Sequence, residues 1–151
     1  MKIGHRDSRV NTSSRSDGSI RAGINLPAVP ESLSAARTFV GSTLEKWNCV
    51  DRDQVVALLT SEIVSNVVRH AGGNVELEMA IVGDHVLRVQ ASDECPDSPV
   101  LQRSELRSEG GRGLLIVDRL ARRWGVEKYE RHKVVWFETD LLPRARVAAL
   151  T

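Results

Sequence analysis

The sequence predicts an α+β domain, a two-layer sandwich in which helices pack on one face of a mixed, mostly antiparallel sheet. Two observations predict it. Helical periodicity comes first, in two consecutive segments, and strand-like segments then come in consecutive pairs separated by one helical segment. A parallel sheet would need strands and helices that alternate throughout, and this chain does not show them. The 151 residues, 41% of them hydrophobic, suit a single domain with its own core.

The first half of the chain predicts one strand and two helices. The strand covers residues 19–26 and ends at Pro27. A helix over 30–47 follows, with Pro30 at its first position. A second helix covers 53–70, capped by Asp51 or Asp53 and ended by the glycines after residue 70. The apolar positions are Leu33, Ala36, Val40, Leu44 and Trp47 in the first helix and Val55, Leu59, Ile63 and Val67 in the second.

The second half changes from helical to strand periodicity. Apolar residues alternate over 75–81 and 87–91 around Gly83, which predicts a hairpin. Residues 94–109 read as a long loop. A third helix opens at residues 110–113, and its apolar side is Leu114, Val117, Leu120, Ala121 and Trp124. Two strands, 126–130 and 133–141, complete the sheet. We expect a disordered arm over 1–23, the domain over 24–142 and a loose tail over 143–151.

Composition excludes several functional classes. The 21 basic and 20 acidic residues nearly balance, which gives no global field for nucleic acid or an anionic membrane. No apolar run reaches the length of a membrane span, and no secretory signal is visible. Cys49 and Cys95 form neither a disulfide framework nor a zinc motif. We therefore expect a cytoplasmic domain that contacts neither a membrane nor nucleic acid directly.

A polar strip interrupts the second helix. Glu62, Asn66 and His70 recur every fourth residue, so they share one side of the helix and border its apolar stripe. Asparagine is a weak helix former, because its amide competes for backbone hydrogen bonds. The residues alone leave two interpretations open, a solvated flank of the helix or a group of side chains that does chemistry.

Two further places break the local pattern. Asp93 is in phase with the apolar positions of its strand, where a buried carboxylate needs a partner. It is also consistent with an ordinary turn residue just past the strand. The run Gly110-Gly111-Arg112-Gly113 leads directly into a helix, where backbone amides and the helix start favour an anion. Walker, Rossmann and HExxH motifs are absent from the sequence.

In this order, the three features resemble the GHKL, or histidine-kinase-like, ATPase family. Residues 58–71 (LLTSEIVSNVVRHA) look like its N box, residues 91–96 (ASDECP) occupy its first glycine box and residues 110–114 (GGRGL) its second. More narrowly, the chain is similar to the anti-sigma-factor serine/threonine kinases and their actinobacterial regulatory relatives. The resemblance covers residues 20–141.

The resemblance implies roles for individual residues. Glu62 would be the general base, Asn66 would bind Mg²⁺, and Asp93 would accept a hydrogen bond from the adenine amino group. ATP and Mg²⁺ are the implied cofactors, and residues 96–110 would form a lid over the nucleotide. The phosphates would be held by the second glycine box, that is by Gly111, Arg112, Gly113 and Leu114.

The implied activity is phosphorylation of a serine on a STAS-type anti-anti-sigma partner, together with sequestration of a sigma factor, by a homodimer. One departure supports an alternative. The usual first glycine box is DxGxG, and this chain has neither glycine in Asp93-Glu94-Cys95-Pro96-Asp97. The alternative is a catalytically weak or inactive module with the same fold that acts by protein–protein binding. A detached histidine-kinase catalytic domain is disfavoured, because we see no helix upstream of the domain with a phosphoacceptor histidine; His5 lies in the expected arm, outside any helical pattern.

Overall fold

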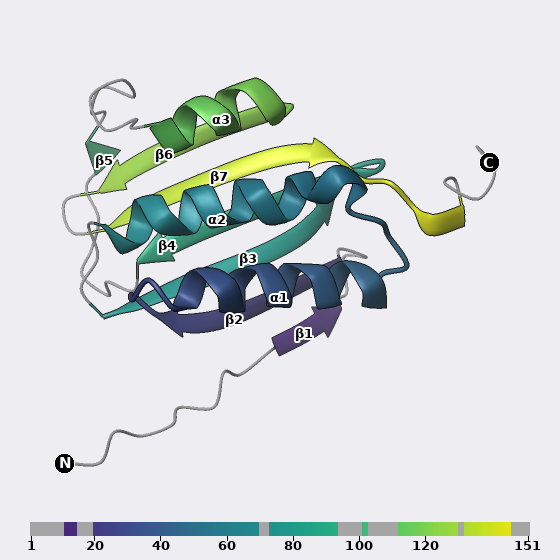
Figure 1. Cartoon of the computed structure of the whole chain (residues 1–151), viewed down its shortest axis with the longest axis horizontal. Helices are drawn as coiled ribbons and strands as arrows, with labels where there is room; N and C mark the ends of the chain where they lie inside the picture. Colours follow the sequence, from purple (N-terminus) through teal and green to yellow (C-terminus); the bar gives the residue numbers. More distant parts are fainter. Residues whose placement is uncertain are drawn as a thin grey trace, which may run out of the picture.

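Seven strands form one sheet in the order β1-β2-β3-β4-β7-β6-β5, and every pair is antiparallel (Figure 1). The computed structural model describes residues 11–14, 20–69, 73–93, 101–102, 112–129 and 132–145. The strands are β1 (Asn11–Ser14), β2 (Ile20–Pro27), β3 (Asn74–Val82), β4 (Val86–Asp93), β5 (Leu101–Gln102), β6 (Arg123–Tyr129) and β7 (Lys133–Asp140). The α+β class is confirmed, and the described part of the sheet is antiparallel rather than mixed.

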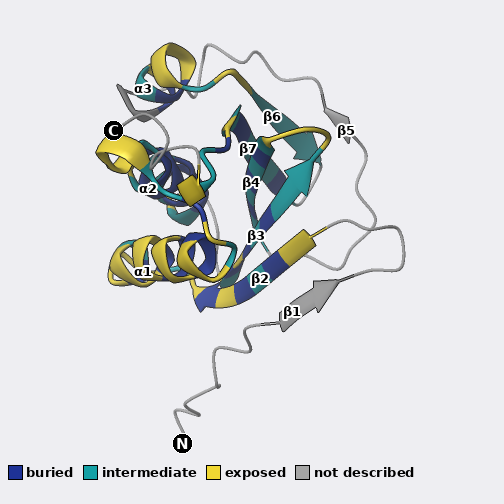
Figure 2. Cartoon of the chain, turned by 90° about the vertical axis from the view of Figure 1, so that its right-hand side faces the viewer, coloured by how far each residue is buried: buried dark blue, intermediate teal, exposed yellow. Residues whose placement is uncertain are grey.

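Helices cover one face of this sheet. They are α1 (Ser32–Lys46), α2 (Val55–Val68), which follows a short 3-10 turn, η1 (Arg52–Gln54), and α3 (Arg112–Leu120). The side of α1 that faces the sheet is buried and its outer side is exposed (Figure 2). Helix α2 is buried or half-buried along its length, except at the exposed Leu58. This two-layer arrangement is the predicted sandwich. No described helix is long and apolar enough to cross a membrane.

The core lies between α2 and the middle strands. Leu59 and Ile63 of α2 are completely buried, as are Leu77 of β3 and Val89 of β4. The β3–β4 register places Leu77 opposite Ala91 and Met79 opposite Val89, so both strands turn their apolar positions to the helices. The alternation over 75–91 therefore predicted both the hairpin and its buried face.

Asp51 caps α2 from outside the helix. Its two carboxylate oxygens accept hydrogen bonds from the backbone N–H groups of Val56 (2.8 Å) and Ala57 (2.9 Å), which have no partners within the helix. Asp53, the alternative cap, instead lies in the intervening turn with a positive φ of 56°. The capping interaction thus selects one of the two predicted aspartates.

The third helix is shorter than predicted. It ends at Leu120, which is exposed, and Trp124 belongs to strand β6 instead of the helix. The reason is pairing with β7: the Arg122 N–H donates to the Glu138 carbonyl (2.8 Å), and Arg123 lies opposite Glu138 in register. Trp124 still faces α3, and its Nε1–H donates to Asp118 Oδ1 (2.8 Å).

Three segments expected to lack structure contribute to the sheet or its surroundings. Within the expected arm, residues 11–14 form β1; residues 20–23 belong to β2, as the strand expected over 19–26 predicted, and residues 1–10 and 15–19 lie outside the described residues. Within the expected loop, Leu101–Gln102 pair with β6. At the start of the expected tail, Pro143 bridges to Cys49. Backbone pairing with residues far away in the chain gives all three segments their structure. A sequence pattern of two to four residues is too short to predict such pairing.

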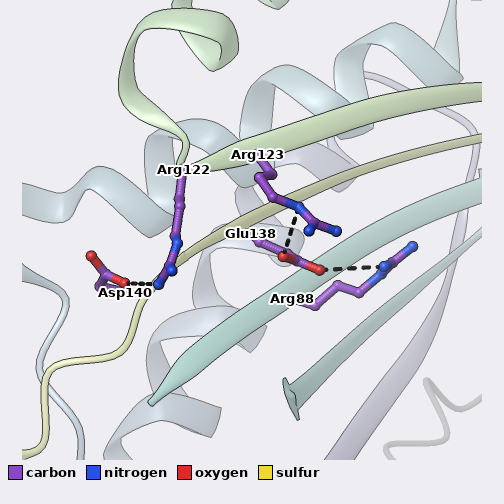
Figure 3. Close-up of polar contacts among 5 residues, drawn as sticks. All are labelled: Arg88, Arg122, Arg123, Glu138 and Asp140. Atoms are coloured by element: carbon purple, nitrogen blue, oxygen red, sulfur yellow. Dashed lines mark hydrogen bonds and ion pairs between the residues drawn. The ribbon is translucent and has the colours of Figure 1, made fainter. Parts of the chain in front are cut away.

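The uncovered face of the sheet carries a charged network (Figure 3). Glu138 of β7 is only 8% exposed and lies between two arginines, Arg88 of β4 and Arg123 of β6, each at 3.4 Å. The Arg88 guanidinium also stacks over the Trp136 ring at 4.2 Å. These partners compensate the burial of a carboxylate on this face.

Candidate functional site

Four chain segments meet at one end of the sandwich. Helix α2 and strand β4 end there, and strand β7 and helix α3 begin there (Figure 1). Two of the residues singled out by the sequence, Asn66 and Asp93, lie in the last turn of α2 and at the last position of β4. The fold therefore brings to one place residues that are far apart in the chain.

Asn66 is buried between α2 and the sheet. Its side chain is on the sheet side of α2 and is 5% exposed, and Oδ1 has no hydrogen-bond partner among the residues that the structure describes. An orphaned buried polar atom costs free energy unless a ligand or water completes it. A neutral amide oxygen is also a hard donor of the kind that Mg²⁺ prefers. Asn66 thus fits the metal-binding role that the resemblance implies.

Glu62 lies one helical turn before Asn66 and is half-buried. It lines a pocket of about 480 Å³ between α1 and α2. The pocket is lined by Leu33 and Arg37 from α1, by Asp53 and Gln54 from η1, and by Ala57, Leu58, Ser61, Glu62 and Ser65 from α2. Asn66 is buried against the sheet, whereas the Glu62 carboxylate remains accessible from this pocket.

The wall of the pocket has two unusual features beside Glu62. Arg37 reaches across from α1 and donates a hydrogen bond to Ser61 Oγ (3.1 Å). Asp53 and Gln54 both have positive φ angles, 56° and 55°, a conformation that costs free energy in residues with a side chain and concentrates at functional sites. The solvated flank that the sequence left open is wrong for the buried Asn66, whereas Glu62 is half-buried and lines the pocket.

Asp93 is held at the edge of the site by the next strand. Its Oδ1 accepts a hydrogen bond from the backbone N–H of Lys133 (2.8 Å), the first residue of β7. Asp93 is half-buried and lies opposite the fully buried Val75 of β3. The hydrogen bond thus fixes the orientation of the Asp93 carboxylate, and a fixed orientation is what a ligand-binding side chain requires.

Lys133 is a site residue that the sequence reasoning missed. Its side chain is 6% exposed, on the same face of β7 as the buried Val135 and Phe137. Burial lowers the pKa of its ammonium to about 8, the Asp93 carboxylate opposes this shift, and the Arg69 guanidinium adds to it. The signal was present in the alternation of β7, where a lysine occupies an apolar position.

The second glycine box lies at the start of α3. The helix begins at Arg112, and the Leu114 side chain is buried, 3% exposed. The Arg112 side chain and the burial of Gly113 are not described, and Gly111, His70 and residues 94–100, which include the second half of the first glycine box, are outside the described residues. Helix α3 begins at the end of the sandwich where β4 ends (Figure 1), as a phosphate-binding role requires.

The fold and these residues define a class of protein, a two-layer α+β domain with a candidate ligand site at one end of its helical layer. The family model described as a histidine kinase-like ATPase domain matches residues 26–139. The chain belongs to this family, and an ATPase domain of this kind implies ATP binding. No curated protein sequence matches the chain significantly.

Proposed function

We propose that this chain is an ATP-binding anti-sigma factor that uses Mg²⁺-ATP to phosphorylate a serine of a STAS-type anti-anti-sigma partner, and that also sequesters a sigma factor. One observation carries the enzymatic part: the accessible Glu62 carboxylate lies one helical turn from the buried Asn66 Oδ1, which has no hydrogen-bond partner in the part of the chain that the structure describes. The identity of both partners, the homodimer and the cytoplasmic location rest on the resemblance to anti-sigma kinases.

The proposed nucleotide spans the end of the sandwich. Asp93 would accept a hydrogen bond from the adenine amino group, and the amides from Gly111 to Leu114 would bind phosphate oxygens at the start of α3. Asn66 would hold Mg²⁺, which would supply positive charge to offset the charge of the phosphates. The buried position of Asn66 would fix the phosphates relative to Glu62.

Glu62 would then serve as the general base for transfer. The serine hydroxyl of the partner attacks the γ-phosphorus and gives its proton to the Glu62 carboxylate. A bond forms between the serine oxygen and phosphorus, the bond from phosphorus to the β–γ bridging oxygen breaks, and ADP leaves with that electron pair. The pocket between α1 and α2 offers space for a serine-bearing loop, and the exposed Leu58 at its wall offers an apolar contact.

A second candidate is a binding module with little or no phosphotransfer. The sequence observation that favours it is Asp93-Glu94-Cys95-Pro96-Asp97, which lacks both glycines of the usual first glycine box. Glycine allows the chain to pass close to a ligand without a side chain in the way. This candidate keeps the partner-binding role and gives up the chemical step.

The first test is calorimetric titration of Mg²⁺-ATP into the purified chain. We expect binding that Asp93→Asn and Asn66→Ala both weaken by about 10-fold or more, since each removes a polar contact made to the ligand. Asp84→Asn, at the exposed turn between β3 and β4, and Asn25→Ala, on the exposed side of β2, are the matched controls. Wild-type protein that binds no ATP at millimolar concentrations would overturn both the nucleotide site and the kinase.

The second test separates the kinase from the binding module. Glu62→Gln keeps the shape of the side chain and removes the base, so it should reduce phosphotransfer to STAS-domain proteins by about 100-fold or more while leaving their binding intact. Glu45→Gln, exposed near the end of α1, is the matched control. Equal phosphotransfer by wild type and Glu62→Gln would contradict the assignment of the base; no phosphotransfer by a wild type that binds both ATP and the partner would favour the second candidate.

A further inference from the structure

Lys133 occupies a position where lysine is unusual. It is the first residue of β7, and its side chain points to the helical layer with Val135 and Phe137. Lysine is almost never so buried unless it is paired with an opposite charge or a ligand. Its burial beside Asp93 places a charged donor within the site that the proposed function assigns to the nucleotide.

The groups around Lys133 come from three elements. Asp93 at the end of β4 accepts a hydrogen bond from the Lys133 backbone N–H and attracts its ammonium, whereas Arg69 just after α2 repels it. Lys128 lies directly opposite in the β6–β7 register. The site therefore presents a hydrogen-bond acceptor, Asp93, and a hydrogen-bond donor, Lys133, on adjacent strands of the same sheet face.

This order of donor and acceptor complements one kind of base. Adenine carries an amino donor flanked on each side by a ring-nitrogen acceptor, N1 and N7, whereas guanine carries an oxygen acceptor at the position of that amino group. An acceptor beside a donor on the protein thus matches two neighbouring atoms of adenine. A guanine oxygen placed against the Asp93 carboxylate would be repelled.

We propose that Lys133 is a specificity-determining residue that donates a hydrogen bond to the ring nitrogen next to the amino group that Asp93 reads. The inference rests on the proposed function, because it takes the base to lie at Asp93. The Lys133 hydrogen bond would be a second contact to the adenine base, made from strand β7. Two contacts at neighbouring atoms would hold the base at a site whose first glycine box lacks the usual glycines.

The test measures the affinity of the full-length chain for Mg²⁺ complexes of ATP, 7-deaza-ATP, 1-deaza-ATP and GTP. We expect one of the two deaza analogues to bind wild type about 10-fold more weakly than ATP does, because it lacks the acceptor for a charged donor. Lys133→Met should bind ATP about 10-fold more weakly than wild type and should no longer distinguish ATP from that analogue. GTP should bind wild type more weakly than ATP does.

Lys128→Met is the matched control, since it removes the same charge one strand farther from Asp93; it should change ATP affinity by less than about twofold. Lys133→Gln, which keeps an amide donor, should bind ATP with intermediate affinity and provides a second variant should Lys133→Met unfold. The proposal would be overturned if Lys133→Met lowered the affinity for ATP and for both analogues by the same factor. It would also be overturned if wild type bound both analogues as tightly as ATP. Wild type that binds no ATP would overturn the nucleotide site as well, so the two failures are distinguishable.

Discussion

The indole of Trp136 lies directly against Gly125 on the neighbouring strand. The two residues are paired in the β6–β7 register, and a Cβ at position 125 would lie 2.7 Å from Trp136 Nε1 and 2.8 Å from two ring carbons. The ring is also covered by the Arg88 guanidinium at 4.2 Å. Glycine is therefore required at position 125 by the packing of a side chain on the uncovered face of the sheet.

Gly125→Ala is expected to lower the free energy of unfolding by about 1–3 kcal/mol, because the new methyl group displaces a ring held from the other side. Urea unfolding measures the change. Gly41→Ala is the control: apart from the neighbouring residues and backbone of α1 itself, no described atom lies within 4 Å of the place that the new methyl group would take. It should therefore stabilise the chain by about 0.5–1 kcal/mol through helix propensity. A Gly125→Ala cost that persists in a Trp136→Ala background would show that the ring is not the cause.

Asp51→Ala is expected to destabilise the chain by about 1 kcal/mol, since it leaves the N–H groups of Val56 and Ala57 without a side-chain cap. Thermal and urea unfolding both report the loss. Asp53→Gly is the matched variant, because it removes a nearby carboxylate at a positive-φ position that glycine tolerates. A larger cost for Asp53→Gly than for Asp51→Ala would contradict the assignment of the cap.

Glu138→Gln should lower the free energy of unfolding by about 1–2 kcal/mol, because two arginines lose a charged partner that is largely buried. Asp140→Asn offers the comparison: its ion pair with Arg122 is closer, 2.8 Å, but both side chains are exposed. We expect a change below about 0.5 kcal/mol there. Equal effects of the two substitutions would mean that burial does not strengthen the Glu138 pairs.

Lys133 should make stability depend on pH in the alkaline range. Its pKa is lowered from 10.5 to about 8 in the folded chain, so the unfolded chain binds more protons between these values. Relative to Lys133→Met, the free energy of unfolding of wild type therefore rises as the pH increases from about 8 toward 10.5. Below pH 8 the buried lysine is charged in both states, so the cost of burying its charge is fully present. Urea unfolding of both proteins at pH 7 and pH 10 measures the difference in their free energies of unfolding. If that difference were the same at both pH values, the pKa of Lys133 would not be lowered by folding.

Much of the fold followed from local patterns. The period of 3.6 in α1 and α2 and the alternation in β3 and β4 predicted those elements and their buried faces, and the order of the elements predicted the α+β class. The same patterns indicated Asn66 and Asp93, because a polar residue at or beside an apolar stripe stands out in sequence. These features depend on residues within one or two turns of each other, so sequence alone determined them.

Tertiary structure decided what depends on distant partners. Pairing with β7 ended α3 at Leu120 and placed Trp124 in a strand, and pairing with β2 and β6 brought β1 and β5 into the sheet. The separation of the buried Asn66 from the accessible Glu62 required the packing of α1 against α2. The burial of Lys133 beside Asp93 required β4 and β7 to be neighbours. The energies of backbone pairing and of charge burial depend on groups that are far apart in the chain. Local periodicity therefore does not predict them.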